Sequence, residues 1–201
     1  MPKNINFTDV NPFKNKVQEA INKSILSTIK NKDFILGKNV KKFEKKFSQL
    51  SNSKYAVGCA TGTDALILSL KSLNLKKKHE IIIPGMSYIS TGLSAALNNN
   101  KIIFADIDND TGLISFESIK KSISKNTKVV IPVNLYGQKV DIKLLRKIVG
   151  KRVFIIEDSA QSHFSSSCHD CNNTDHFLCF KKEKSHQYAD LSCYSFYPSK
   201  N

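Results

Sequence analysis

The stretch of sequence that decides the fold is Val153-Phe154-Ile155-Ile156-Glu157-Asp158-Ser159-Ala160-Gln161. Its apolar residues run without polar alternation, which predicts a strand that is buried on both faces. Similar short runs predict further strands over residues 55–60, 81–83, 101–105, 129–133 and 191–196. Strands of this kind are typical of a parallel sheet that is covered by helices on both faces.

Helices are predicted between these strands. Apolar residues at helical spacing indicate helices over residues 17–29, 40–50, 65–73, 87–97, 116–123 and 142–149. The alternation of strands and helices indicates an α/β fold with three layers, in which a mostly parallel sheet lies between two layers of helices.

The charge balance is strongly basic, because the 201 residues include 31 Lys+Arg and 17 Asp+Glu, a formal net charge of +14. Only Arg146 and Arg152 are arginines, whereas proteins that read nucleic acids usually cluster arginine. We therefore favour solvated surface lysines and keep a basic nucleic-acid-binding module as a minor alternative. No apolar run approaches the roughly 18 residues of a membrane span, and the N-terminus does not resemble a signal peptide. We expect a cytoplasmic protein with neither membrane nor nucleic acid as a partner.

Five cysteines, an odd number, argue against a closed disulfide framework. Cys59 and Cys193 lie in apolar runs, so we expect both to be core thiols. A segment at about 165–188 contains Cys168, Cys171, His176, Cys179 and His186, which could bind zinc. We favour a variable surface insertion without metal, because the spacing fits no standard zinc module.

Polar residues and glycines follow several of the predicted strands. Parallel strands end at a common edge, where ligands of such sheets bind. Gly62 and Thr63 open a helix whose N-terminus could hold a phosphate, although Thr61 or Thr63 could simply cap that helix. Asp158 is costly to bury unless it meets a ligand or caps the next turn. Lys200 follows the last strand, where it could form a Schiff base or be one more surface lysine.

In combination, these residues favour one cofactor. Pyridoxal phosphate (PLP) needs an anion site, a carboxylate for its pyridine nitrogen and an amine for its aldehyde. The sequence resembles the DegT-type sugar aminotransferases, which are PLP-dependent enzymes of fold type I, from about Asn11 to Asn201. The resemblance rests on blocks that occur in the family's order: Phe34-Ile35-Leu36-Gly37, Phe43-Glu44, Tyr55-Ala56-Val57-Gly58, Gly62-Thr63-Asp64-Ala65-Leu66, Ile83-Pro84-Gly85-Met86-Ser87-Tyr88-Ile89-Ser90-Thr91, Asp106-Ile107-Asp108, Ile131-Pro132-Val133-Asn134-Leu135-Tyr136-Gly137-Gln138, Ile156-Glu157-Asp158-Ser159-Ala160-Gln161 and Ser195-Phe196-Tyr197-Pro198-Ser199-Lys200.

The resemblance implies a catalytic role for one lysine. Lys200 would form the Schiff base with the cofactor and then move the proton between the substrate carbon and the cofactor. Asp158 would pair with the pyridine nitrogen and keep it protonated. Relatives that dehydrate sugars have histidine in place of this lysine, so Lys200 favours transamination.

The resemblance also implies the remaining cofactor contacts. Tyr88 would stack on the pyridine ring, and Gln161 would lie near the ring face or its phenolic oxygen. Gly62, Thr63 and Ser195 would hold the phosphate through backbone and hydroxyl groups.

The implied reaction moves an amino group, with glutamate as the common donor in this family, to a keto group of a nucleotide-linked sugar. Such enzymes make amino sugars for surface polysaccharide, and family members are expected to be homodimers. The family continues beyond the lysine with a C-terminal small domain, which we expect to be absent here. Residues 1–50 would then be an N-terminal helical segment, and residues 51–201 the PLP-binding large domain with its insertion at about 165–188. The alternative is a catalytically inactive fragment.

Overall fold

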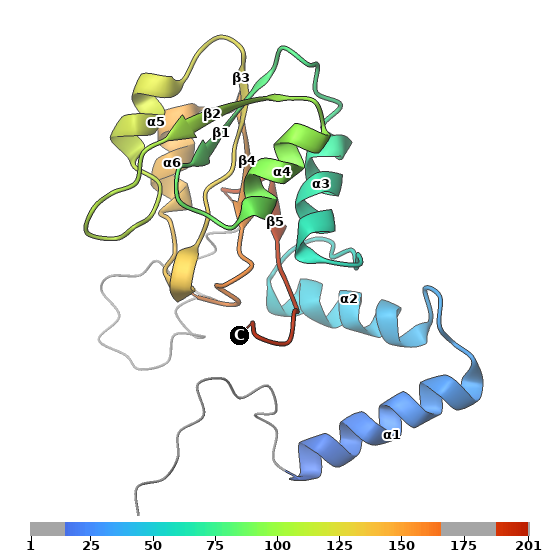
Figure 1. Ribbon diagram of the computed structural model, residues 1–201. Helices are drawn as coiled ribbons and strands as arrows, with labels where there is room; N and C mark the ends of the chain where they lie inside the picture. The colour runs from blue at the N-terminus through green and yellow to red at the C-terminus, as the bar shows by residue number, and fades with distance from the viewer. Residues whose placement is uncertain (1–14, 166–187, 201) are drawn as a thin grey trace, which may run out of the picture. The chain divides into compact units, whose positions relative to one another are not determined.

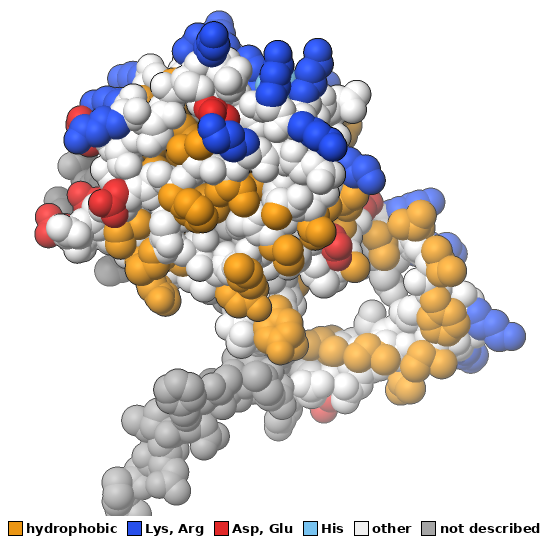
Figure 2. Space-filling model, turned by 45° about the horizontal axis from the view of Figure 1, so that its top comes forward, with side chains coloured by type: hydrophobic (Ala, Val, Ile, Leu, Met, Phe, Trp, Pro, Cys, Tyr) orange, Lys and Arg blue, Asp and Glu red, His pale blue; other side chains and the backbone are white. Residues whose placement is uncertain are grey.

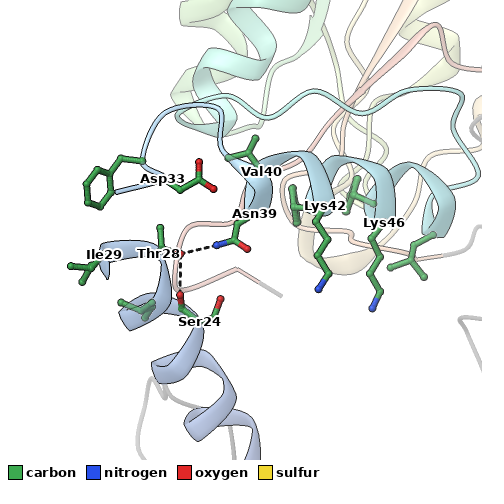
Figure 3. Close-up of a pocket in the computed structure, with 13 residues that line it drawn as sticks. Ser24, Thr28, Ile29, Asp33, Asn39, Val40, Lys42 and Lys46 are labelled. Carbon is green, nitrogen blue, oxygen red and sulfur yellow. Dashed lines mark hydrogen bonds between the residues drawn. The ribbon is translucent and has the colours of Figure 1, made fainter. Parts of the chain in front are cut away.

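The computed structural model describes residues 15–165 and 188–200 (Figure 1). The chain divides between Gly58 and Cys59 into two compact units. The first unit contains helices α1 (Asn15–Asn31) and α2 (Lys38–Leu50). Figure 3 shows the hollow between them, where the side chain of Asn39 donates a hydrogen bond of 2.7 Å to the hydroxyl of Thr28. Apolar side chains of both helices line this hollow, with Lys42 and Lys46 along α2.

The second unit is built on a parallel sheet in the order β2-β1-β3-β4-β5 (Figure 1). Its strands are β1 (Glu80–Pro84), β2 (Lys101–Ala105), β3 (Thr127–Val130), β4 (Phe154–Asp158) and β5 (Leu191–Cys193). Every pair of neighbouring strands is parallel. The predicted parallel sheet is therefore confirmed, and the carboxyl ends of these strands meet at one edge.

Helices cover both faces of the sheet. They are α3 (Gly62–Ser72), α4 (Ile89–Leu97), α5 (Phe116–Ser122) and α6 (Ile142–Val149), with a short 3₁₀ helix, η1 (Leu135–Gly137), after β3. On one face Ile156 packs with Leu66 of α3 and Ala95 of α4. On the other face Ile155 packs with residues of α5 and α6, among them Leu145. These two cores confirm the three-layer α/β architecture.

Arg146 of α6 fixes the edge strand β5 beside β4. Its guanidinium donates to the carbonyl oxygens of Tyr188 and Val153 and forms a salt bridge with Asp190. The Asp190 carboxylate also accepts a 2.7 Å hydrogen bond from the backbone N–H of Ile155. One of the two arginines is therefore part of the scaffold, because it joins the segment before β5 to α6 and β4.

The predicted strand over residues 55–60 is wrong. Tyr55 and Val57 are 73% and 85% exposed, and no strand forms there. The N–H of Gly58 donates instead to the Glu44 carboxylate of α2, at 2.7 Å, so this stretch pairs with a helix rather than with a strand. Cys59 is exposed for the same reason, whereas Cys193 is buried in the core as predicted.

The insertion predicted at about 165–188, with its cysteines and histidines, lies almost entirely outside the described residues. Within residues 15–165 and 188–200, no group of three or more His, Cys, Asp or Glu side chains could hold a metal ion. In the same part of the chain, no helix has the length and apolar character needed to cross a bilayer.

A pair of matched substitutions tests the core. Ile82 is fully buried in the sheet, at 0% exposure, so Ile82→Ala should lower the free energy of unfolding by about 2–5 kcal/mol. Ile89 on α4 is 70% exposed, and Ile89→Ala should change that free energy by only about 0.5 kcal/mol. Urea denaturation of both variants measures the difference. Equal losses would contradict this assignment of the core.

Candidate functional site

The start of α3 lies against the segment that follows β5. A Cβ placed on Gly62 would be 2.9 Å from the Cβ of Ser195 and 3.3 Å from its hydroxyl oxygen. Only glycine permits this approach without displacing Ser195. The N-terminus of α3 and the hydroxyl of Ser195, which the family resemblance assigns to a phosphate site, therefore lie together.

The N-terminus of α3 is capped by Thr61, whose hydroxyl accepts a 3.0 Å hydrogen bond from the N–H of Asp64. The ordinary N-cap interpretation of Thr61 is thus correct. Gly62 and Thr63 are the first residues of the helix, so their own N–H groups have no partner within it. The Thr63 hydroxyl is 2.7 Å from that of Ser90 in α4. The helix start therefore keeps its capacity to bind an anion.

Asp158 ends β4 and is buried, with 5% of its surface exposed. One carboxylate oxygen accepts a 3.1 Å hydrogen bond from the Thr91 hydroxyl of α4, and the other accepts one of 3.2 Å from the N–H of Ala160. The second bond is the turn cap that the sequence left open as an alternative. Burial raises the pKa of Asp158, while these hydrogen bonds and the positive charge of Lys200 oppose the rise.

Lys200 lies in a turn after β5, in which its backbone N–H donates to the carbonyl oxygen of Tyr197 at 2.8 Å. The lysine is close enough to lower the pKa values of both Asp158 and His163. His163 is held between the rings of Tyr194 and Phe196, and burial is the main cause of its lowered pKa. The positive charge of Lys200 therefore acts on the carboxyl group of Asp158, as a weaker cause than burial and the two hydrogen bonds.

The hydrogen bond of Gln161 and the position of Tyr88 involve residues other than Gly62, Ser195, Asp158 and Lys200, which we call the site cluster. The side-chain oxygen of Gln161 accepts a 2.9 Å hydrogen bond from the N–H of Tyr136, at the same edge of the sheet. Tyr88 is the N-cap residue of α4 and is 70% exposed. Its side chain makes no capping hydrogen bond. Its ring is thus available to a ligand, but no contact among the described residues fixes it against the cluster.

No motif predicted the side chains that contact Asp158 and Glu157, the two carboxylates at the end of β4. Thr91 holds Asp158, while Asn134 and Lys139 contact Glu157. Thr91 lies in the first turn of α4 and is fully buried, at 0% exposure, so a polar residue on the buried face of a predicted helix could have indicated it. For Lys139 no sequence signal exists, because it is one lysine among many.

Several lysines of the described residues lie where strands begin, at the opposite edge of the sheet: Lys76 and Lys78 precede β1, Lys101 begins β2 and Lys128 is in β3. Figure 2 shows Lys and Arg side chains gathered along the top of the molecule in that view. Burial is the largest cause of the lowered pKa of His79, and the charges of Lys128, Lys78 and Lys76 lower it further. Anion binding at the candidate site would therefore depend on the helix N-terminus and Lys200 rather than on the lysine-rich edge.

Comparison with known sequences identifies the family. Residues 15–201 match the DegT/DnrJ/EryC1/StrS aminotransferase family, and the chain belongs to it. It is 31% identical to the UDP-2-acetamido-2-deoxy-3-oxo-D-glucuronate aminotransferase of Pseudomonas aeruginosa, over 98% of this chain and 51% of that protein. It is 31% identical to the dTDP-3-amino-3,6-dideoxy-alpha-D-galactopyranose transaminase of Aneurinibacillus thermoaerophilus, over 79% of this chain and 44% of that protein.

Solved structures show the same fold. The crystal structure of NtdA from Bacillus subtilis with bound cofactor PMP has a TM-score of 0.82 and 27% identity, covering all of this chain and 42% of that one. DesV of S. venezuelae, in complex with a ketimine intermediate, has a TM-score of 0.76 and 26% identity over 79% of this chain and 43% of its own. The chain spans about half the length of the relatives that it matches.

The close approach at Gly62 can be tested with a second glycine as control. Gly62→Ala should lower the free energy of unfolding by about 1–3 kcal/mol, because its Cβ would overlap Ser195. Gly92→Ala, inside α4, adds a Cβ 3.5 Å from Ile83 and should raise stability by up to about 1 kcal/mol. Urea denaturation compares them, and a stable Gly62→Ala variant would contradict the close contact.

Burial of Asp158 predicts a pH-dependent stability. A carboxyl whose folded-state pKa is raised contributes stability that is full below its unfolded pKa and is lost as the pH rises through the folded pKa. The side-chain amide introduced by Asp158→Asn is neutral, and it could accept from Ala160 and donate to Thr91. Asp158→Asn should therefore have a melting temperature a few degrees above that of the wild type at pH 7. The difference between the two melting temperatures should shrink as the pH falls.

Thermal melts across the acid range measure this effect. Asp110→Asn is the control, because Asp110 lies exposed in a loop and should leave the pH dependence unchanged. If Asp158→Asn melted below the wild type at pH 7, the carboxylate would be a net stabilising group and this account of its burial would fail.

Proposed function

We propose that this chain belongs to a PLP-dependent aminotransferase that transfers an amino group to a keto group of a nucleotide-linked sugar. The observation that carries the proposal is the buried carboxylate of Asp158, which feels the charge of Lys200 at the sheet edge where Ser195 meets Gly62. Membership of the aminotransferase family supports the reaction class.

The residues present fit PLP. Gly62 lets the N-terminus of α3 lie directly against Ser195, because a Cβ at position 62 would be 2.9 Å from the Ser195 Cβ. Asp158 combines burial with two hydrogen-bond donors, so its carboxylate is held in one orientation. Lys200 supplies the amine at the same edge. When bound, PLP withdraws electrons from the carbon that bears the amino group.

Each side chain then has a defined task. Lys200 would bind the cofactor through Nζ and, once released by the substrate, carry a proton to and from the substrate carbon. Asp158 would hold a proton on the pyridine nitrogen. The N–H groups of Gly62 and Thr63 and the hydroxyl of Ser195 would donate hydrogen bonds to the phosphate. The roles proposed for Tyr88 and Gln161, at the ring face, rest on the family resemblance alone.

The names of the relatives support the substrate class. Those in P. aeruginosa and A. thermoaerophilus act on UDP-linked and dTDP-linked sugars. A further relative, at 33% identity over 76% of this chain, is a GDP-4-keto-6-deoxy-D-mannose 3-dehydratase of Escherichia coli O55:H7. Lys200 favours amino transfer over dehydration, because the family's dehydratases carry histidine at this position. We propose glutamate as the donor, and a homodimer as the state of the longer protein.

Addition of PLP to the purified chain tests the proposal. The wild type should develop a visible absorbance band that Lys200→Ala lacks, and Lys143→Ala should retain it, since Lys143 is exposed on α6. Glutamate should bleach the band if it is the amino donor. A folded wild-type chain without any band would favour the inactive-fragment alternative, and a band that survives in Lys200→Ala would refute the role of Lys200.

A further inference from the structure

Strand β4 ends in two adjacent carboxylates that face opposite sides of the sheet. Side chains alternate along a strand, and Ile155 and Ile156 lie in the two separate cores. Glu157 therefore points to the side of α5 and α6, and Asp158 to the side of α3 and α4. The contacts agree with this assignment, because Asp158 meets Thr91 of α4, whereas Glu157 meets Lys139 of the loop that precedes α6.

The Glu157–Lys139 ion pair is removed from water. The two side chains are 1% and 3% exposed, and Nζ lies 3.5 Å from Oε1. The same carboxylate oxygen accepts a 2.7 Å hydrogen bond from the side chain of Asn134, and the other accepts one of 3.1 Å from the hydroxyl of Ser192 on β5. The carboxylate is thus held by Ser192 of β5 and by Asn134 from the segment that follows β3.

These contacts extend to the backbone around Asp158. Asn134 donates its own N–H to the carbonyl oxygen of Asp158 at 3.0 Å, and its side-chain oxygen accepts from the N–H of Val140, next to Lys139. Its amide nitrogen also reaches the Ser159 hydroxyl, at 3.1 Å. The ion pair and Asn134 therefore link the loop that contains Lys139 to Glu157 and Ser159, the two neighbours of Asp158 in the chain.

Stability alone gives a weak reason for such a pair. A buried ion pair gains little over apolar side chains of similar volume, because both charges lose their hydration. The pair does, however, bear on the neighbouring site, since the charge of Glu157 raises the pKa values of Asp158 and Tyr194 as a cause secondary to burial. A cation beside Glu157 offsets that negative field.

We propose that Lys139, through its buried ion pair with Glu157, is a positioning residue of the cofactor site: it fixes the end of β4 and balances the charge behind Asp158. This inference rests on the proposed PLP-dependent function. The titratable groups that act on this region are Glu157 and Asp158 on β4, His163 after it, Cys193 on β5, Tyr194 after it, Lys200 and Lys139. Among the contacts of the described residues, Lys139 is the one cation of this group that forms an ion pair with Glu157.

The test compares Lys139→Met, Glu157→Gln and the double variant in the full chain. PLP is titrated into each, and the visible band is followed across pH. We expect about 10-fold weaker PLP binding in all three, by analogy with the loss seen when the hydrogen-bonding partners of metal ligands are removed. The midpoint of the band's pH transition should rise in Lys139→Met, because the negative field left behind favours the protonated chromophore. It should fall in Glu157→Gln and return near the wild-type value in the double variant.

The opposite shifts separate positioning from a merely structural role, which would lower melting temperatures without moving the midpoint. The control is Glu117→Gln with Lys120→Met, which removes an exposed ion pair of 2.6 Å on α5 and should change neither quantity. If Lys139→Met fails to fold, the PLP affinity of the double variant tests the inference, because that variant leaves neither partner of the ion pair charged. Wild-type affinity in the double variant overturns the inference, and a wild-type chain that binds no PLP overturns the proposed function and the inference together.

Discussion

Two adjacent carboxylates at the end of a buried strand impose the constraint on which the rest of this structure depends. A carboxylate without partners is too costly to keep in a protein interior, and alternation along β4 turns Glu157 and Asp158 to different faces. One layer of helices therefore supplies Thr91 to Asp158, while the loop before α6 supplies Lys139 to Glu157. The neighbouring strand β5 contributes Ser192. The end of β4 is thus the point at which all three layers of the fold are joined by polar contacts.

The proposed cofactor site includes a carboxyl group whose charged form is destabilised by burial. Burial raises the pKa of Asp158, so its ionised form is stabilised only by the donors and the positive charge around it. Such a cost in stability is typical of functional sites, and it fits the proposed role of Asp158 in holding a proton on a bound heterocycle. Lys76, Lys78 and Lys128, which lie where β1 and β3 begin, add net charge but are not among the causes that shift the pKa of Asp158.

Local sequence patterns predicted most of the elements, because short apolar runs and helical spacing respond to burial that any α/β sandwich provides. The prediction over residues 55–60 failed since strand formation needs a paired neighbour, and Gly58 instead donates to Glu44. Motifs at strand ends predicted the site residues. The same motifs did not predict which side chains those residues contact. Thr91 and Asp158 are 67 positions apart in the chain, and Thr63 and Ser90 are 27 apart, so only the packing of α3, α4 and β4 brings them together.

The sequence by itself determined the family, the parallel order of strands and helices, and the residue types that gather at one edge of the sheet. These features are local, because they follow from apolar periodicity and from short motifs that retain their meaning in isolation. Only the tertiary structure decided which partner each carboxylate takes. Glu157 and Asp158 are neighbours in the chain and equal in charge, but the alternation of β4 gives Glu157 a buried lysine and gives Asp158 a threonine hydroxyl and the field of Lys200. That choice depends on the layers that cover the sheet, which no single stretch of the sequence contains.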